Sequence, residues 1–317
     1  MKIVVLDAVT LGTDLDLSPL SEVGECIAYA TSSKEELQER IADAEVIVLN
    51  KLRIDEAVLA SAKSLRLVCV TATGYDNIDV AACRRHGVAV CNVKGYSTDS
   101  VAQLTVAMAL SLVNRLPEYC AAVRDGSYTR GGVANILIPA YHEISGKTWG
   151  IVGLGNIGGK VAAVAKAFGC KVIAYKRTPG GEIPCTDLET LLRTSDIVSL
   201  HTPLTDETRG LIGKKELSSM KDGAILINVA RGAVTDEAAV AKAVKSGKLG
   251  GIGVDVYSKE PFSEAHPFYE IKDLPNVCLT PHMAWGAKEA RERCISEICL
   301  NIAAFLRGET RSRVDLG

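Results

Sequence analysis

Short runs rich in Val, Ile and Leu alternate with amphipathic stretches along almost the whole chain. Such runs are typical of strands buried on both faces of a parallel sheet. They predict strands at residues 2–6, 46–49, 67–71, 89–92, 148–152, 171–175, 197–200, 224–228, 251–254 and 277–279. The amphipathic stretches predict helices at residues 34–41, 55–62, 161–168 and 236–246. This repeated strand–helix–strand order indicates an α/β fold with doubly wound parallel sheets.

The pattern also divides the chain into parts. The strands up to residue 92 predict one small α/β unit, and a second unit opens at Thr148 with a glycine-rich turn. Between them, residues 97–115 are apolar on nearly every side, which predicts a long buried helix. Residues 118–145 have no strand pattern, and an irregular stretch of that length is usually functional or an interface arm. Residues 287–307 predict a further amphipathic helix.

Composition narrows the class of protein. The chain has 317 residues, which suggests about two domains. A net charge of −2 argues against nucleic-acid and anionic-membrane surfaces, since both need a basic excess. The most apolar stretch, 101–113, is too short for a membrane-spanning helix, and the N-terminal segment lacks a signal-peptide pattern. Ten scattered cysteines, without a CxxC pair or zinc-type spacing, predict free thiols in a reducing cytoplasm and no metal site.

The strongest local motif is a glycine-rich turn between a predicted strand and a predicted helix. The strand at 148–152 runs into Gly153-x-Gly155-x-x-Gly158. Gly153 permits the tight turn, Gly155 lets the backbone approach a pyrophosphate, and Gly158 lets the helix pack on the strand. Amides at the helix start and the helix dipole favour a negative charge there. Glycines also serve plain turns, but these flanking elements favour a dinucleotide site.

The next predicted strand ends in an unusual pair of cations. A chain that binds NAD carries an acid about 20 residues after the glycines, where it bonds the ribose hydroxyls. This chain has Lys176 and Arg177 at that place. Two cations can hold the extra phosphate of NADP, so the pair favours NADP over NAD. The other interpretation is a solvated basic turn beside an ordinary NAD ribose.

Three polar residues follow buried strands of the second unit. Arg231 follows the strand at 224–228, Glu260 follows the strand at 251–254, and His282 follows the strand at 277–279. Ligands of an open parallel sheet bind at the carboxyl ends of its strands, so we expect these side chains in one crevice.

These residue types suit hydride transfer to a 2-oxo acid. Arginine offers a fixed fork of donors that grips a carboxylate and polarises the carbonyl. Histidine donates a proton to the forming alkoxide near neutral pH, and glutamate orients the imidazole. Each residue alone has an ordinary explanation, as a salt-bridged Arg, a surface Glu or a turn His. Their joint position downstream of a dinucleotide turn favours catalysis by Arg231, Glu260 and His282.

Four motifs resemble those of the D-isomer-specific 2-hydroxyacid dehydrogenases. They are the glycine turn, NVARG at 228–232 with Asp236, GVDVY at 253–257 with Glu260-Pro261, and Pro281-His282. The resemblance covers nearly the whole chain in the family's order. It implies that the predicted triad is catalytic. It also implies a flavodoxin-like catalytic, substrate-binding domain from residues 1–97 and 286–317, with an NAD(P)-binding Rossmann domain inserted at 98–285.

The same resemblance implies further contacts, a subfamily and an assembly. Substrate contacts are implied for Thr73, Gly74, Tyr75, Arg231, His282 and Trp285. Cofactor contacts are implied for Val101, Gly153, Gly155, Asn156, Ile157, Gly158, His201, Pro203, Val229, Ala230, Arg231, Asp255 and His282. Gln103 and HMAW at 282–285 resemble the glycerate dehydrogenase and hydroxypyruvate reductase branch, although Trp285 can equally be an interface or core residue. Family members are generally homodimers, with subunit contacts where residues 118–145 lie.

The leading hypothesis is a D-2-hydroxyacid dehydrogenase that uses NAD(P)H to reduce a small 2-oxo acid such as hydroxypyruvate or glyoxylate. The alternative from another class is a dinucleotide-sensing protein like the corepressors that resemble this family. The complete triad and the lack of a long basic extension favour the enzyme. Oxidation of formate or phosphite is a third option, and formate enzymes carry Gln where this chain has Glu260.

Overall fold

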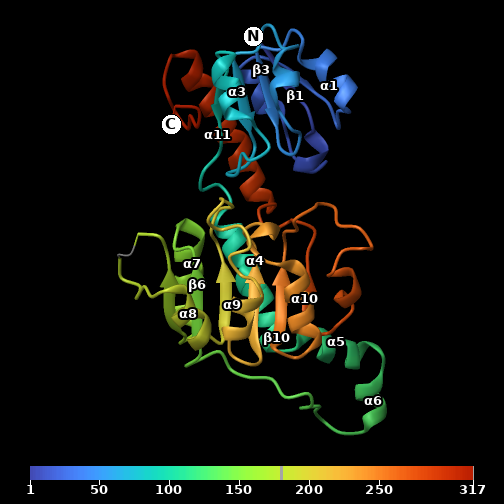
Figure 1. Ribbon diagram of the computed structural model, residues 1–317. Coiled ribbons are helices and arrows are strands. Elements are labelled where there is room, and N and C mark those ends of the chain that lie inside the picture. The colour runs from blue at the N-terminus through green and yellow to red at the C-terminus, as the bar shows by residue number, and fades with distance from the viewer. Residues whose placement is uncertain (179–180, 317) are drawn as a thin grey trace. The chain divides into compact units, whose positions relative to one another are not determined.

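The computed structural model describes residues 1–178 and 181–316, and the chain divides into two compact units (Figure 1). The first unit comprises Met1–Ser97 and Trp285–Gly317, and the second comprises Thr98–Ala284. Trp285, which the sequence analysis assigned to the cofactor domain, lies in the first unit, where its ring meets Tyr96 edge-on at 6.4 Å. Each unit is built on its own parallel sheet, which confirms the predicted fold class.

The first unit has a five-stranded parallel sheet in the order β2-β1-β3-β4-β5, the flavodoxin-like order. Its strands are β1 (Lys2–Val5), β2 (Glu25–Ala28), β3 (Val46–Leu49), β4 (Leu67–Val70) and β5 (Ala89–Cys91). The sequence analysis missed β2. This edge strand begins with an exposed glutamate and is only half-buried, so it lacks the continuous apolar run of the inner strands.

Helices from both ends of the chain cover this sheet. They are η1 (Ala8–Leu11), η2 (Ser18–Glu22), α1 (Lys34–Ile41), α2 (Glu56–Leu59), α3 (Val80–Arg85) and α11 (Lys288–Leu306). The predicted helix at 34–41 starts where Ser33 and Glu36 cap each other's backbone N–H groups. Helix α11 buries Ile295, Ile298 and Ile302 in the same core as β1, β3 and β4. The C-terminal part of the chain therefore completes the core of the N-terminal unit.

The second unit has a six-stranded parallel sheet in the order β11-β10-β9-β8-β6-β7. Its strands are β6 (Thr148–Val152), β7 (Lys171–Tyr175), β8 (Ile197–Leu200), β9 (Ala224–Asn228), β10 (Leu249–Val254) and β11 (Val277–Leu279). Beside β7, Ala174 and Cys185 form an isolated parallel bridge. With that bridge counted as a strand, the unit has the Rossmann order 3-2-1-4-5-6, extended by β11.

The helices of this unit lie between and beside these strands. They are α4 (Thr98–Val113), α5 (Leu116–Arg124), α6 (Ser127–Gly131), α7 (Asn156–Ala167), α8 (Leu188–Thr194), α9 (Lys214–Ser219), η3 (Gly232–Val234), α10 (Glu237–Lys245) and η4 (Tyr269–Ile271). Helix α4 packs beside α7 and against β10. A Cβ atom on Gly253 would lie 3.0 Å from Met108, so the glycines of β10 let α4 approach closely. Contrary to the all-round pattern predicted, α4 buries one side and exposes Gln103.

After α4, an extended segment of the second unit runs away from its sheet (Figure 1). It carries α5 and α6 and then runs without regular structure until β6 (Figure 1). Leu137 is 63% exposed and Ile138 is 84% exposed, which is unusual for such large apolar side chains. Among the described residues, no helix combines the length and apolarity needed to cross a membrane.

Candidate active site

The glycine turn joins β6 to α7 as the sequence predicts. Gly153 has a φ of +95°, which favours glycine, and a Cβ atom there would lie 2.7 Å from the carbonyl carbon of His201. A Cβ atom on Gly158 would lie 2.2 Å from the Gly153 carbonyl oxygen, so only glycine lets α7 pack this closely on the turn. At two of the three positions, the close backbone contact is therefore possible only because glycine has no side chain.

Gly155, the middle glycine of the motif, marks an open cradle. A Cβ atom on Gly155 would meet no atom of the described chain within 4 Å, and Gly155 and Asn156 are exposed. Among the described residues, no side chain caps the start of α7. The first N–H groups of a helix need acceptors, and the positive end of its dipole favours an anion. The turn thus fits a dinucleotide pyrophosphate, with Gly155, Asn156 and Ile157 as the residues that would hold it.

Lys176 and Arg177 lie beside this cradle. The Gly153 N–H donates to the carbonyl oxygen of Tyr175, the last residue of β7, at 2.9 Å. Lys176 and Arg177 follow directly; Lys176 is half-buried and Arg177 is exposed. Two cations therefore stand at the strand end where a dinucleotide's adenosine ribose binds in this fold.

His201 lies under the glycine turn, at the end of β8. Its Nε2 atom lies 2.9 Å from the Ser199 hydroxyl, which also accepts a hydrogen bond from the Trp149 indole at 3.0 Å. The Nδ1 atom of His201 is buried, and the described chain gives it no partner. Burial lowers the pKa of His201 to about 3, so the ring is neutral at physiological pH. Pro203, exposed in the same loop, accepts the Thr208 hydroxyl through its carbonyl oxygen.

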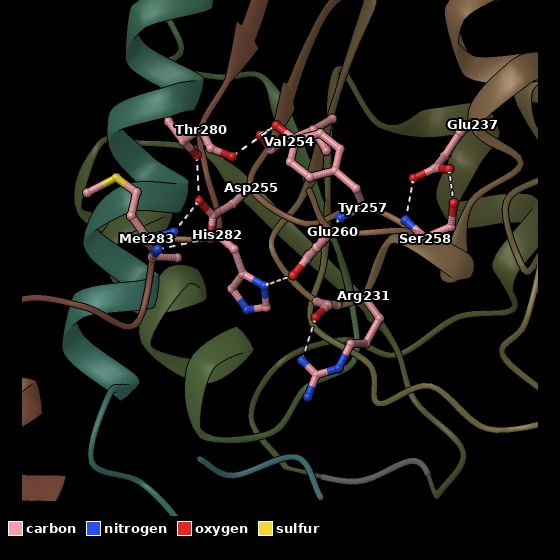
Figure 2. Close-up of polar contacts among 12 residues, drawn as sticks. Arg231, Glu237, Val254, Asp255, Tyr257, Ser258, Glu260, Thr280, His282 and Met283 are labelled. Atoms are coloured by element: carbon pink, nitrogen blue, oxygen red, sulfur yellow. Dashed lines mark hydrogen bonds and ion pairs between the residues drawn. The ribbon is translucent and has the colours of Figure 1, made fainter. Parts of the chain in front are cut away.

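Arg231 stands on a turn that Asn228 shapes. The Asn228 side chain accepts the Ala230 N–H at 3.0 Å and donates to the Arg231 carbonyl oxygen at 2.9 Å. Val229 and Ala230 are buried within the turn. The Arg231 guanidinium donates to the Ala230 carbonyl oxygen at 2.8 Å (Figure 2). Asn228 itself is buried, so it fixes the backbone from which Arg231 extends.

Glu260 and His282 meet across the loops after β10 and β11 (Figure 2). The His282 Nδ1 atom lies 2.6 Å from Glu260 Oε2, and the other oxygen of Glu260 accepts the Tyr257 N–H at 3.0 Å. His282 has a φ of +54°, a left-handed conformation that is uncommon outside glycine. Strain of this kind clusters at functional sites. Both side chains are partly exposed, so a substrate can reach them.

Asp255 holds the loop that carries His282. Its carboxylate is fully buried and accepts the Thr280 hydroxyl at 2.5 Å, the Met283 N–H at 2.8 Å and the Ala284 N–H at 2.9 Å. Burial raises the pKa of Asp255, although these hydrogen bonds oppose the shift. Asp255 thus braces both sides of His282. The nicotinamide contact implied for Asp255 by family resemblance stays a prediction.

Three of the predicted substrate residues, Thr73, Gly74 and Tyr75, lie beyond the carboxyl end of β4 in the first unit. The Thr73 hydroxyl donates to the Val93 carbonyl oxygen at 2.8 Å, and the Asn92 amide donates to the Thr73 carbonyl oxygen at 2.7 Å. Tyr75 is exposed and Gly74 is half-buried. Val101, by contrast, lies in the second unit and is buried on α4. The roles of all these residues remain predictions.

The structure also adds residues that sequence reasoning missed. Asn228 shapes the Arg231 turn, and Thr280 bonds Asp255. Glu237 and His266 form a buried pair at 3.0 Å near the Glu260 loop. The sequence held one signal for Glu237, since Asp236 and Glu237 stand at the start of a predicted helix. Asp236 does cap α10. Within the described residues, no group of three His, Cys, Asp or Glu side chains could hold a metal ion.

The second unit therefore brings a dinucleotide cradle and the Arg231, Glu260 and His282 turns to the carboxyl ends of one parallel sheet. Fold and site together define a nicotinamide-dependent oxidoreductase. A family model described as D-isomer specific 2-hydroxyacid dehydrogenase, NAD binding domain, matches residues 106–284. The chain belongs to the D-isomer-specific 2-hydroxyacid dehydrogenases.

Three relatives are similar over most of their length. A glycerate dehydrogenase of Methylorubrum extorquens is 36% identical, covering 90% of each chain. A hydroxypyruvate reductase of Blautia hydrogenotrophica is 35% identical, covering 97% of this chain and 98% of the relative. A glyoxylate reductase of Thermococcus litoralis is 40% identical, covering 86% of this chain and 84% of the relative.

Two solved structures share the whole fold. A D-lactate dehydrogenase from Aquifex aeolicus, complexed with NAD and lactic acid, has a TM-score of 0.87, 29% identity and 99% coverage of both chains. An acyclic imino acid reductase in complex with NADPH and D-Arg has a TM-score of 0.87 and 30% identity, covering 99% of this chain and 100% of the other. These two neighbours hold different nicotinamide dinucleotides.

Proposed function

We propose that this protein reduces a small 2-oxo acid, such as hydroxypyruvate or glyoxylate, to the D-2-hydroxy acid. The observation that carries the proposal is the 2.6 Å contact between Glu260 and His282, at the sheet edge that also carries the Arg231 turn. The names of the relatives, glycerate dehydrogenase, hydroxypyruvate reductase and glyoxylate reductase, support the choice of substrates.

Each side chain of the triad has a distinct task in this proposal. Arg231 binds the substrate carboxylate with its fork of donors and polarises the carbonyl. Because Nδ1 of His282 is bonded to Glu260, the Nε2 side of the ring presents the proton to the forming alkoxide. Glu260 fixes the ring orientation and stabilises its positive charge. The reduced dinucleotide, when bound, supplies the hydride.

The preferred dinucleotide in our proposal is NADPH. Lys176 and Arg177 stand where an acid would otherwise bond the ribose hydroxyls, and their charges complement a phosphate. A solvated basic turn beside NADH is the competing interpretation. Both dinucleotides occur in solved neighbours, so the assignment depends on these two side chains alone.

We further propose that the protein is a homodimer in a reducing cytoplasm. The segment after α4 exposes Val123, Val133, Leu137 and Ile138, and a second copy would cover them. All ten cysteines are free thiols, which suits a reducing compartment. The alternative of a dinucleotide-sensing protein receives no support from the three relatives above, which carry enzyme names.

The test is oxidation of NADPH and NADH by the purified protein with hydroxypyruvate, glyoxylate and pyruvate at neutral pH. Turnover with hydroxypyruvate or glyoxylate, faster with NADPH, is the expected result. Faster turnover with NADH would keep the enzyme and remove the role of Lys176 and Arg177. Tight dinucleotide binding without turnover of any 2-oxo acid would favour the sensing protein.

A further inference from the structure

A buried carboxylate that the proposed reaction does not use lies next to the Glu260 loop. Glu237 is the first residue of α10 and is 9% exposed. Its Oε1 accepts the Ser258 N–H at 2.8 Å, and its Oε2 accepts the Ser258 hydroxyl (Figure 2). The same Oε2 lies 3.0 Å from His266 Nε2. A buried charge is costly unless donors surround it, and the helix start adds a favourable dipole.

The neighbouring imidazole is locked in one tautomer. The Phe268 N–H donates to His266 Nδ1 at 3.1 Å, so the proton of the neutral ring sits on Nε2 and points at Glu237. The rings of Tyr257, Phe262 and Phe268 surround His266 at centroid distances of 6.0, 4.9 and 5.1 Å. The Glu237 carboxylate therefore accepts hydrogen bonds from both Ser258 and His266.

These contacts meet at the two consecutive peptides on either side of Tyr257. The Ser258 N–H donates to Glu237, and the preceding N–H, that of Tyr257, donates to Glu260 at 3.0 Å. A Cβ atom on Gly232 would lie 2.0 Å from the Tyr257 carbonyl carbon, so the backbone next to Arg231 packs against the Tyr257–Ser258 peptide. A shift of that peptide would carry the adjoining Tyr257 N–H with it, move Glu260 and press on the Arg231 turn.

We propose that Glu237 is a positioning residue for the proposed reaction: with His266, it holds the Tyr257–Ser258 peptide so that Glu260 meets His282. The inference rests on the function proposed above. Glu237 touches no reacting atom and acts through Glu260. The competing interpretation is that Glu237 stabilises the loop without affecting catalysis, and it predicts different results.

Glu237→Gln is the informative substitution because it keeps size and shape but replaces an acceptor with a donor. If the amide nitrogen faces His266, it meets the Nε2 proton, and the ring cannot change tautomer without opposing the Phe268 N–H. If the amide turns over, its nitrogen meets the Ser258 N–H. Either orientation places two donors together, so the loop must move. Glu189→Gln, an exposed glutamate in the first turn of α8, is the matched control.

The test is a double-mutant cycle with Glu260→Gln, measuring kcat, KM and dinucleotide affinity. We expect Glu237→Gln to lower kcat by about tenfold or more with unchanged dinucleotide affinity, since small misplacements of catalytic groups are costly. In the Glu260→Gln background, the same change should alter kcat less than about twofold, because coupled sites are not additive. Equal losses in both backgrounds, or an unchanged kcat with a lower melting temperature, would overturn the inference.

Ser258→Ala serves if Glu237→Gln does not fold, because it removes only one donor. A kcat loss in the wild-type background that disappears with Glu260→Gln supports the proposal, and equal loss in both overturns it. NMR of the five histidines, with His282→Gln for assignment, gives a readout independent of turnover. The His282 ring resonance should move in Glu237→Gln and stay fixed in Glu189→Gln. A wild type without turnover would refute the proposed function, whereas an unmoved resonance would refute this inference.

Discussion

His282 Nδ1 and Glu260 Oε2 lie 2.6 Å apart, although 22 residues separate them in the sequence. Asp255 bonds the residues that flank His282, and the Tyr257 N–H holds Glu260 from the other side. The acid and the orienting carboxylate of the proposed reaction are therefore held in place by the loops at the sheet edge before a substrate binds. Preorganisation of this kind lowers the cost of reaching the reactive geometry.

Arg231→Ala should abolish most turnover while dinucleotide binding survives. The guanidinium is assigned to the substrate, whereas Gly153, Gly155 and Gly158 belong to a separate cradle. We expect kcat/KM to fall by about 100-fold or more, because the fork makes two charge-assisted contacts and each is worth about 10-fold or more. Steady-state kinetics and dinucleotide titration measure the two effects. Arg231→Lys keeps the positive charge but lacks the fork of donors, so it should recover little of the lost turnover. Undiminished turnover in Arg231→Ala would refute the assignment.

Lys176→Asp should shift the dinucleotide preference toward NADH. A carboxylate at the end of β7 would bond ribose hydroxyls and repel an additional phosphate. The loss of one charge-assisted contact corresponds to a change of about 10- to 100-fold in the ratio of kcat/KM for NADPH over NADH. Lys166→Asp, on the exposed last turn of α7, is a control for general charge. An unchanged ratio in Lys176→Asp would contradict a contact between Lys176 and the phosphate of NADPH and would favour the solvated basic turn.

His201 should make the protein sensitive to acid. Burial lowers its folded-state pKa to about 3, against 6.5 for an ordinary histidine, so the unfolded chain binds the extra proton between these values. The free energy of unfolding should therefore fall as pH drops from 6.5 toward 3, by at most about 1.4 kcal/mol per pH unit.

Urea unfolding at several pH values measures this effect. His201→Gln should flatten the pH dependence in that window, and His142→Gln, at an exposed position, should leave it as in the wild type. The same slope in His201→Gln and wild type would show that other groups cause the acid sensitivity.

Ile138→Asp should dissociate the proposed homodimer. Ile138 is 84% exposed, and a charge placed in an apolar interface carries a large desolvation cost. Light scattering after size-exclusion chromatography should give twice the chain mass for wild type and the single mass for the variant. Val9→Asp, at another exposed apolar position, should leave the mass unchanged. A monomeric wild type would contradict the assembly.

Local sequence patterns predicted most of the fold. The strand at 148–152 and the turn at Gly153 appear as expected, because buried apolar runs and glycine geometry are local properties. The edge strand β2 was missed because its residues are half exposed.

The same limit applies to the site. Arg231, Glu260 and His282 could be selected because each follows a strand. The Glu237–His266 pair could not, because its hydrogen bonds join residues 29 positions apart and depend on how the loop packs. Asp255 was predicted from resemblance, but its contacts with Thr280 and Met283 required the fold.

The most direct test of the central claim is hydride transfer itself. Purified protein would be given hydroxypyruvate or glyoxylate and reduced dinucleotide with deuterium at both C4 positions of the nicotinamide, and the product analysed by mass spectrometry. Chiral analysis would be applied to the product of hydroxypyruvate, because glycerate has a stereocentre at C2 even when it carries no deuterium. We expect deuterium at C2 of the 2-hydroxy acid, D-glycerate from hydroxypyruvate, and at most a trace of product with His282→Gln. Unlabelled product, L-glycerate, or equal labelled product from His282→Gln would contradict the account.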